Sequence, residues 1–167
     1  MTSTPPLHGQ LEDGPRGPEL QLIRSYPVDV RTLWEALTVS DRLERWIGRI
    51  EGDPASGQVT FFMTAEGEDV EPEHCVIRDC VPERSFALDT STGDGAWHLR
   101  IALTPSGEGT DLLFAQEVGE DPLGSIGPGW EYYLERLARA LAGTDPDAVR
   151  WDAFFPALQE PYETLAR

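Results

Sequence analysis

The feature that most constrains the fold is one long amphipathic stretch near the C-terminus, residues 127–142. Apolar side chains recur along it at Trp130, Leu134, Leu137 and Leu141. This spacing places them on one stripe of an α-helix. Pro128 suits a first helical position and Gly143 suits a C-terminal cap, so the glycine-rich run 124–129 is interpreted as the hinge and cap of the helix. The sequence therefore predicts a long helix with one face that other elements must cover.

The residues before this helix predict an antiparallel sheet. Residues 19–26 alternate as a first strand that Pro27 ends. Two short helices follow, the first with Asp29 as N-cap and the second over residues 40–46. Short alternating runs, separated by turn residues, then predict six strands at 49–51, 58–65, 73–80, 85–90, 96–104 and 110–118. This order indicates an α+β fold in which one curved antiparallel sheet wraps around the long helix.

The two-residue period of a strand predicts which side chains share the apolar face of the sheet. That face is assigned Val59, Phe61, Met63, Phe86, Leu88, Trp97, Leu99, Ile101, Leu103, Leu112, Phe114 and Gln116. Asp79 and Gln116 are polar residues that this parity aims inward, where each needs a partner such as a ligand or a water molecule. His74, Arg78 and His98 fall by parity on the solvent face.

The two ends of the chain differ from the middle. Residues 1–18 contain four prolines and three glycines with almost nothing apolar, so they predict a disordered or extended arm. Residues 19–143 form the predicted domain. The tail, residues 144–167, carries too many aromatic side chains to be free in water and is expected to pack on the domain or on a partner chain.

Composition narrows the functional classes. With 30 acidic and 13 basic residues the net charge is −17, which repels nucleic-acid phosphates and anionic membrane surfaces, so neither is expected as a partner. Cys75 and Cys80, if they share one strand, lie about 16 Å apart and cannot form a disulfide. The first residues resemble no secretion signal, and no apolar run reaches the ~20 residues of a membrane span, so a cytoplasmic location is predicted.

Three segments carry a resemblance to a known family. The first reads Tyr26-Pro-Val-Asp-Val-Arg-Thr-Leu-Trp34 and runs into Leu43-Glu-Arg-Trp46; the second reads Val76-Ile-Arg-Asp-Cys-Val-Pro-Glu-Arg84; the third is Gly129-Trp130 with the leucines that follow. Over residues 20–141 the chain resembles the SRPBCC superfamily, the Bet v 1-like or START-like helix-grip fold. Within it, the chain is similar to the C-terminal domain of the Hsp90 ATPase activator. Asp79 and Ser85 depart from this pattern, because apolar residues are usual there.

The resemblance implies a cavity between the curled sheet and the long helix, able to hold a small apolar or aromatic molecule. The lining it implies is Trp34, Phe61, Met63, Phe86, Trp97, Leu99, Phe114, Trp130 and Tyr133, with Asp79 and Gln116 as the inward polar groups. Large side chains at sheet parity also serve simply to fill a core. The same residues therefore fit either a ligand site or a packed interior.

Noncatalytic binding of such a ligand is the predicted function, and two alternatives stay open. One is a protein-interaction module similar to the Hsp90 activator domain, using the apolar tail or the acidic surface toward a protein partner or a second copy in a homodimer. The other is an aromatase/cyclase-like enzyme, for which parity offers only Asp79, Gln116 and Tyr133 as polar groups. The sequence contains neither a His-Glu-x-x-His nor a Cys-x-x-Cys pattern, so no metal site and no cofactor are predicted.

Overall fold

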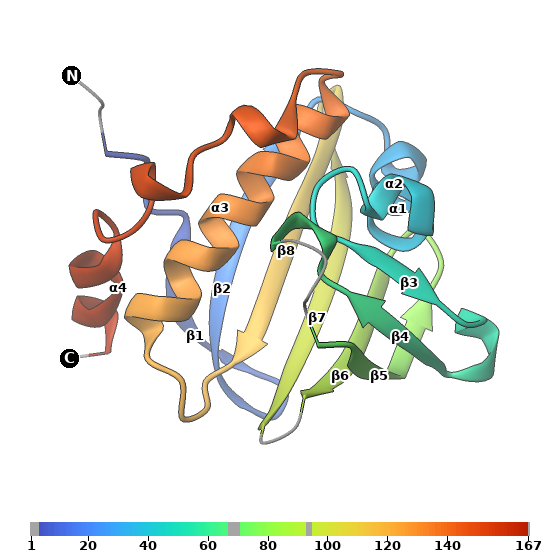
Figure 1. Cartoon of the computed structure of the whole chain (residues 1–167), viewed down its shortest axis with the longest axis horizontal. Helices are drawn as coiled ribbons and strands as arrows, with labels where there is room; N and C mark the ends of the chain where they lie inside the picture. The colour runs from blue at the N-terminus through green and yellow to red at the C-terminus, as the bar shows by residue number, and fades with distance from the viewer. Residues whose placement is uncertain (1–3, 67–70, 93–94, 167) are drawn as a thin grey trace.

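The computed structural model describes residues 4–66, 71–92 and 95–166 (Figure 1). One eight-stranded antiparallel sheet curves around a long helix, in the strand order β1-β2-β8-β7-β6-β5-β4-β3. The strands are β1 (Gly9–Gly14), β2 (Gly17–Tyr26), β3 (Arg49–Glu51), β4 (Gln58–Phe62), β5 (Glu73–Val81), β6 (Ser85–Thr92), β7 (Gly95–Ser106) and β8 (Gly109–Glu117). The helices are α1 (Val30–Thr38), α2 (Ser40–Leu43), α3 (Leu123–Leu141) and α4 (Gln159–Leu165). The predicted helix-grip fold is confirmed.

Local sequence explains how the sheet and helices meet. Asp29 caps α1 as predicted, since its carboxylate accepts a hydrogen bond from the Thr32 amide at 2.7 Å. The apolar stripe of α3 packs against one side of the sheet, where β2 lies beside β8. The side chains buried there include Leu20, Leu22, Leu112, Phe114, Leu134 and Leu137. Tyr26 ties the layers together because its buried hydroxyl donates to the Leu134 carbonyl at 2.9 Å.

The N-terminal segment adds a strand that was not predicted. Of the two expected forms, disordered or extended, residues 9–14 adopt the extended one and pair with β2 from Gly9↔Leu22 to Gly14↔Gly17. The turn between β1 and β2 holds Gly17 at a φ of +141°, a conformation open to glycine. The glycines that suggested a loose arm therefore serve a tight hairpin. The proposed division into arm, domain and tail stays a prediction.

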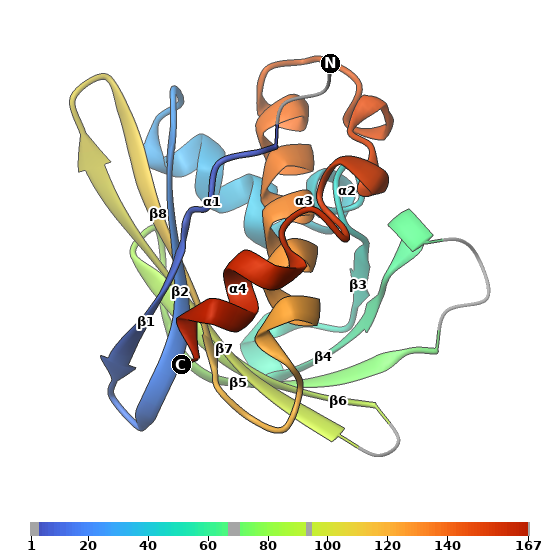
Figure 2. The same ribbon diagram turned by 90° about the vertical axis from the view of Figure 1, so that its left-hand side faces the viewer.

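Helix α3 begins four residues earlier than predicted, and Pro128 lies inside it rather than at its first position. The run 124–129 is therefore not a hinge. A Cβ atom on Gly127 would lie 2.3 Å from the Tyr162 ring, and one on Gly124 would lie 2.7 Å from Glu163. These glycines bring the backbone of α3 close to α4, which crosses it in Figure 2.

The C-terminal tail packs on its own domain. Phe154, Leu158 and Tyr162 are buried in the same core as α3. The buried guanidinium of Arg136 donates to the Pro146 carbonyl at 2.9 Å and to the Trp46 carbonyl at 2.7 Å. One cation thus holds the start of the tail and the segment after α2 against α3.

Glu131 joins the two ends of the chain. It is 1% exposed and accepts a hydrogen bond from the His8 amide at 2.7 Å, while its other carboxylate oxygen lies 2.7 Å from His8 Nδ1. The Tyr162 hydroxyl donates to the same carboxylate. Burial, reinforced by the charge of Glu131, raises the pKa of Tyr162, so this phenol stays protonated and keeps donating.

Candidate functional site

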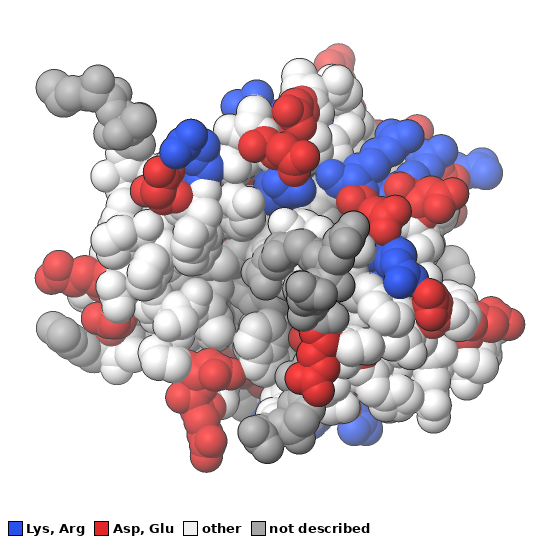
Figure 3. All heavy atoms as spheres, in the orientation of Figure 1, with Lys and Arg blue, Asp and Glu red and all other residues white. Residues whose placement is uncertain are grey.

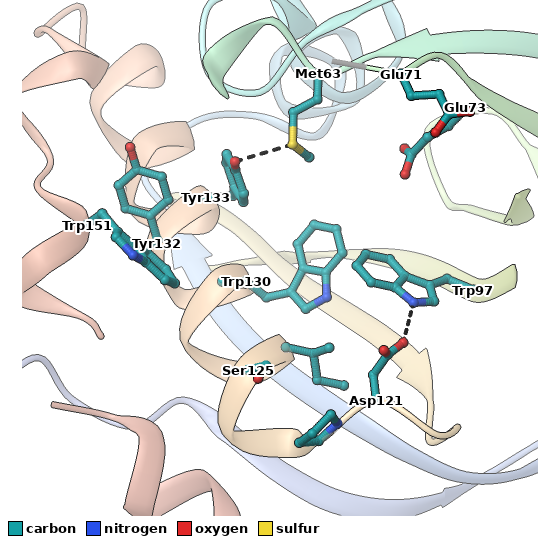
Figure 4. Close-up of a pocket in the computed structure, with 13 residues that line it drawn as sticks. Met63, Glu71, Glu73, Trp97, Asp121, Ser125, Trp130, Tyr132, Tyr133 and Trp151 are labelled. Carbon is teal, nitrogen blue, oxygen red and sulfur yellow. Dashed lines mark hydrogen bonds between the residues drawn. The ribbon is translucent and has the colours of Figure 1, made fainter. Parts of the chain in front are cut away.

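A groove of about 780 Å³ lies between α3 and the rim of the sheet (Figure 4). This volume falls in the ~300–1,000 Å³ range of small-molecule sites. Its walls carry the aromatic residues Trp97, Trp130, Tyr132, Tyr133 and Trp151, the acidic residues Glu71, Glu73 and Asp121, and Met63, Pro122, Ser125, Ile126 and Gly129. Asp121, Ser125 and Trp151 are exposed, so the groove is open to solvent along one side.

The groove exists because α3 covers only part of the concave face of the sheet. Figure 1 shows α3 over β2 and β8, with β3, β4 and β5 curving away from it. Inward side chains of β2 and β8 are buried, as Leu22 and Phe114 illustrate. Several inward side chains of β4 to β7 are only half-buried; they include Phe61, Ile77, Phe86, Leu88, Trp97 and Leu99. Apolar surface on that half of the sheet therefore remains available to a ligand.

Trp130 forms the floor of the groove and belongs to the core as well. It is 8% exposed, its ring lies 4.3 Å from that of Phe114, and its indole N–H donates to Gln116 Oε1 at 2.6 Å. Gln116 was predicted to need a partner, such as a ligand or a water molecule. Trp130 is that partner, because strand parity aims Gln116 and the apolar stripe of α3 aims Trp130 into the same layer.

The walls are held by further contacts among aromatic residues. Trp97 meets Trp130 edge to face at 6.1 Å, and its indole N–H donates to Asp121 Oδ2 at 2.7 Å. On the opposite wall the Tyr133 hydroxyl donates to Met63 Sδ at 3.4 Å. Figure 4 shows the rings of Trp97 and Trp130 facing the open space between these two walls. The groove is thus shaped by side chains that hold one another in place.

The tail completes the rim of the groove. Trp151 stacks on Phe155 with ring centroids 5.5 Å apart and meets Tyr132 edge to face at 5.5 Å. Trp151 is nevertheless 44% exposed, the largest aromatic surface at this rim. The exposed indole of Trp151 therefore extends the aromatic lining of the groove to the protein surface.

The structure brings four of the predicted lining residues together in the groove, namely Met63, Trp97, Trp130 and Tyr133. Trp34, Phe61, Phe86 and Leu99 lie on the same concave side and pack against the core, half-buried. Trp34 contacts Phe86 edge to face at 5.7 Å. Phe114 and Gln116 are buried beneath Trp130. Whether these residues contact a ligand stays a prediction.

The prediction that Asp79 points inward is wrong. Asp79 is exposed and pairs with Ala87 on the outer face, because a β-bulge between Ile77 and Asp79 inserts Arg78 into β5. A bulge of one residue reverses the parity of everything after it. Asp79 therefore does not point into the groove.

Sequence reasoning named Trp130 and Tyr133 on α3 but missed the other residues that this helix contributes to the groove. Ser125, Ile126, Gly129 and Tyr132 lie on the groove side of this helix. Their three- and four-residue spacing would have revealed a second face of the helix, had its start been placed at residue 123. Asp121 and Trp151 carried no signal, because only the folded chain brings them beside Trp97 and Tyr132.

The outer face of the sheet carries paired charges instead of a site. Glu19 is buried and accepts two hydrogen bonds from the Arg100 guanidinium, both at 2.8 Å, which hold the pKa of Glu19 below its ordinary value. Burial raises the pKa of Asp89, but hydrogen bonds from His98 and Arg78 outweigh it, so the net shift is downward. His98 thus lies on the outer face, as parity predicted.

No group of three His, Cys, Asp or Glu side chains stands ready to hold a metal ion in residues 4–66, 71–92 and 95–166. Over the same residues no helix combines the length and apolarity needed to cross a membrane.

A family model decides the classification of the chain. The model described as "Activator of Hsp90 ATPase homolog 1-like protein" matches residues 27–142, from the approach to α1 to the end of α3. The chain belongs to this family. The family model thus spans both walls of the groove apart from Trp151, which lies in the tail. No curated protein matches the chain.

Solved structures share the fold of this family member. CalU16 from Micromonospora echinospora is similar at 23% identity, with 94% of each chain covered and a TM-score of 0.69. A protein from Bordetella parapertussis matches at 23% identity over 98% of this chain and 93% of its own, with a TM-score of 0.68. DynU16, from the dynemicin biosynthetic locus, matches at 19% over 77% of this chain and 49% of its own, with a TM-score of 0.60. At these identities the likeness shows the fold alone.

Proposed function

We propose that this protein binds a small, mostly apolar and aromatic molecule in the groove between α3 and the sheet. The observation that carries the proposal is the groove itself, an open space of about 780 Å³ lined by five aromatic side chains, one of them 44% exposed. A packed domain would bury such surface, whereas a binding protein keeps it open to its ligand.

The free energy available from burying apolar surface suits a ligand with a single aromatic ring or two fused rings. At about 25 cal/mol per Å², a bicyclic aromatic that buries roughly 200 Å² gains about 5 kcal/mol. Association costs reduce this gain, so a simple probe should bind with a Kd of high micromolar or above. A natural ligand that also contacts Trp151 and Met63 should bind more tightly.

The protein-interaction alternative invoked the apolar tail or the acidic surface. The tail offers little apolar surface to a partner, because Phe154, Leu158 and Tyr162 are buried against α3. Trp151 is left, and it lies at the rim of the groove, where a small molecule can use it. One structural neighbour, DynU16, belongs to a biosynthetic locus, which agrees with small-molecule chemistry.

The cyclase-like alternative depended on three polar groups that do not converge. Asp79 lies on the outer face, Gln116 accepts from Trp130, and Tyr133 donates to Met63. General acid–base chemistry needs its groups within hydrogen-bond reach of one reacting centre. Binding without turnover is the function that the groove supports best.

The tryptophan side chains provide the test. Of the five, Trp97, Trp130 and Trp151 line the groove, while the indole of Trp46 is buried and donates to the Ala36 carbonyl at 2.9 Å. We expect 2-naphthylmethanol, titrated into ¹⁵N-labelled protein, to shift the indole N–H resonances of the three groove residues saturably and to leave that of Trp46 unchanged. Single Trp→Phe variants assign the resonances. Equal shifts at all five indoles, or no saturable shift, would refute the proposal.

A further inference from the structure

We infer that the groove selects positively charged ligands, namely aromatic or alkyl ammonium compounds, over neutral and anionic molecules of the same shape. This inference deepens the proposed function and rests on it. It draws on three separate properties of the lining, which are its charge, its ring faces and its hydrogen-bond donors.

The charged groups of the lining all have one sign. Glu71, Glu73 and Asp121 are acidic, and the described lining includes neither arginine nor histidine. Figure 3 shows acidic side chains at the turn before α3 and beside the start of β5, while basic ones gather toward the top and right of this face. A cleft lined by one sign of charge concentrates ligands of the opposite sign and repels those of the same sign.

The aromatic rings add a second preference for cations. An ammonium group within about 6 Å of a Trp or Tyr face is attracted by the negative potential of the ring, and this attraction grows as water is excluded. Trp97 combines both features, since its N–H holds the carboxylate of Asp121 at the edge of the ring, 2.7 Å from Nε1. A cation seated against the open face of either indole would therefore meet an aromatic ring and lie near one fixed negative charge (Figure 4).

Three side-chain donors of the lining are already engaged. The indole N–H of Trp97 donates to Asp121, that of Trp130 to Gln116, and the Tyr133 hydroxyl to Met63. A carboxylate or sulfonate entering the groove would lose hydration without gaining these hydrogen bonds, and burying an unpaired charge is costly.

The start of α3 acts in the opposite direction. Its N-terminus carries a partial positive charge equivalent to about half an elementary charge, which favours anions. Asp121 lies two residues before the helix begins, and its carboxylate has a formal charge of −1. The carboxylate therefore outweighs the helix terminus at this end of the groove.

Three probes of one shape test the inference by isothermal titration calorimetry on the full chain. They are (2-naphthylmethyl)trimethylammonium, 2-naphthylmethanol and 2-naphthylmethanesulfonate. We expect the ammonium compound to bind about tenfold more tightly than the alcohol, from one carboxylate and one or two ring contacts together. The sulfonate should bind more weakly than the alcohol. The preference for the ammonium compound should shrink at 1 M salt, since surface charges are screened.

Two variants test which carboxylate produces the preference for the ammonium compound. Asp121→Asn keeps an acceptor for Trp97 but removes the charge, so ammonium affinity should fall about three- to fivefold while the alcohol is unaffected. Glu108→Gln removes an exposed acidic residue from the turn before β8, outside the groove, and should leave the ratio unchanged.

The outcomes separate the inference from the proposed function. If the alcohol binds and the ammonium compound binds no more tightly, or if Glu108→Gln weakens ammonium binding as much as Asp121→Asn, the inference fails and the proposed function stands. If none of the three probes binds, the proposed function fails and the inference fails with it.

Discussion

The contact between α3 and α4 gives the sharpest test of the packing, through the variant Gly127→Ala. In an exposed helix this change stabilises by about 1 kcal/mol. Here the new Cβ would lie 2.3 Å from two atoms of the Tyr162 ring, where contacts of about 3.5 Å are normal. Tyr162 is fully buried and its hydroxyl donates to Glu131, so the ring cannot move aside without breaking that bond.

The expected cost follows from these contacts. Forcing a methyl group into a packed core costs about 1–3 kcal/mol, and weakening the buried hydrogen bond to a carboxylate adds about 1–2 kcal/mol. After the helix gain is subtracted, Gly127→Ala should lower the free energy of unfolding by about 1–4 kcal/mol. A chain of this size then loses about 2–4 °C in Tm per kcal/mol.

Urea denaturation followed by Trp fluorescence measures the loss, and two further variants interpret it. Gly129→Ala lies in the same helix with nothing within 4 Å of its new Cβ, so it should be neutral or stabilising. In a Tyr162→Ala background, Gly127→Ala should no longer destabilise. If Gly127→Ala lowers the free energy of unfolding equally in both backgrounds, the restriction that Pro128 places on the preceding residue explains the loss. The packing argument is then refuted.

Two further predictions concern titratable groups. The pKa of Glu19 is lowered by Arg100 below its ordinary value of 4.5, so its stabilising effect is complete above pH 4.5 and is lost as the pH falls through the lowered value. Glu19→Gln should therefore lower the free energy of unfolding by about 1–3 kcal/mol at pH 7. Urea titrations should show the difference between wild type and variant shrinking toward pH 3, and a difference independent of pH would contradict this. Burial raises the pKa of the Cys75 thiol to about 11, whereas Cys80 is exposed. A thiol reagent at pH 8 should therefore modify Cys80 promptly and Cys75 only on unfolding, as mass spectrometry of the two peptides would show. Equal rates of modification would contradict the burial of Cys75.

Much of the fold could be predicted because two periodicities dominate it. The two-residue period placed Trp97 and Phe114 on one face of the sheet, and the 3.6-residue stripe of α3 defined what that face must cover. These signals are local, so they survive without knowledge of tertiary contacts. They predicted the α+β fold class, whereas the lining residues were named from the resemblance to the helix-grip fold, and four of those lie in the groove.

The features that were missed have causes that these periodicities do not report. The bulge at Arg78 adds one residue and turns Asp79 outward, and no composition signal marks it. Gly127 was interpreted as part of a cap because glycine usually interrupts a helix, whereas its reason for being there is Tyr162, far along the chain. The groove depends on the same kind of long-range meeting, since Trp151 reaches the rim only after the tail has folded back.

The measurement that tests groove binding most directly is a titration of 2-naphthylmethanol against wild type and Gly129→Leu. Gly129 lines the groove and a Cβ there has nothing within 4 Å, so leucine should occupy the ligand space without disturbing the core. We expect saturable binding to wild type, at least a tenfold weaker affinity for Gly129→Leu, unchanged affinity for Gly129→Ala, and a Tm for both variants no lower than that of wild type. Equal binding to wild type and Gly129→Leu would show that the ligand lies elsewhere and would contradict the account.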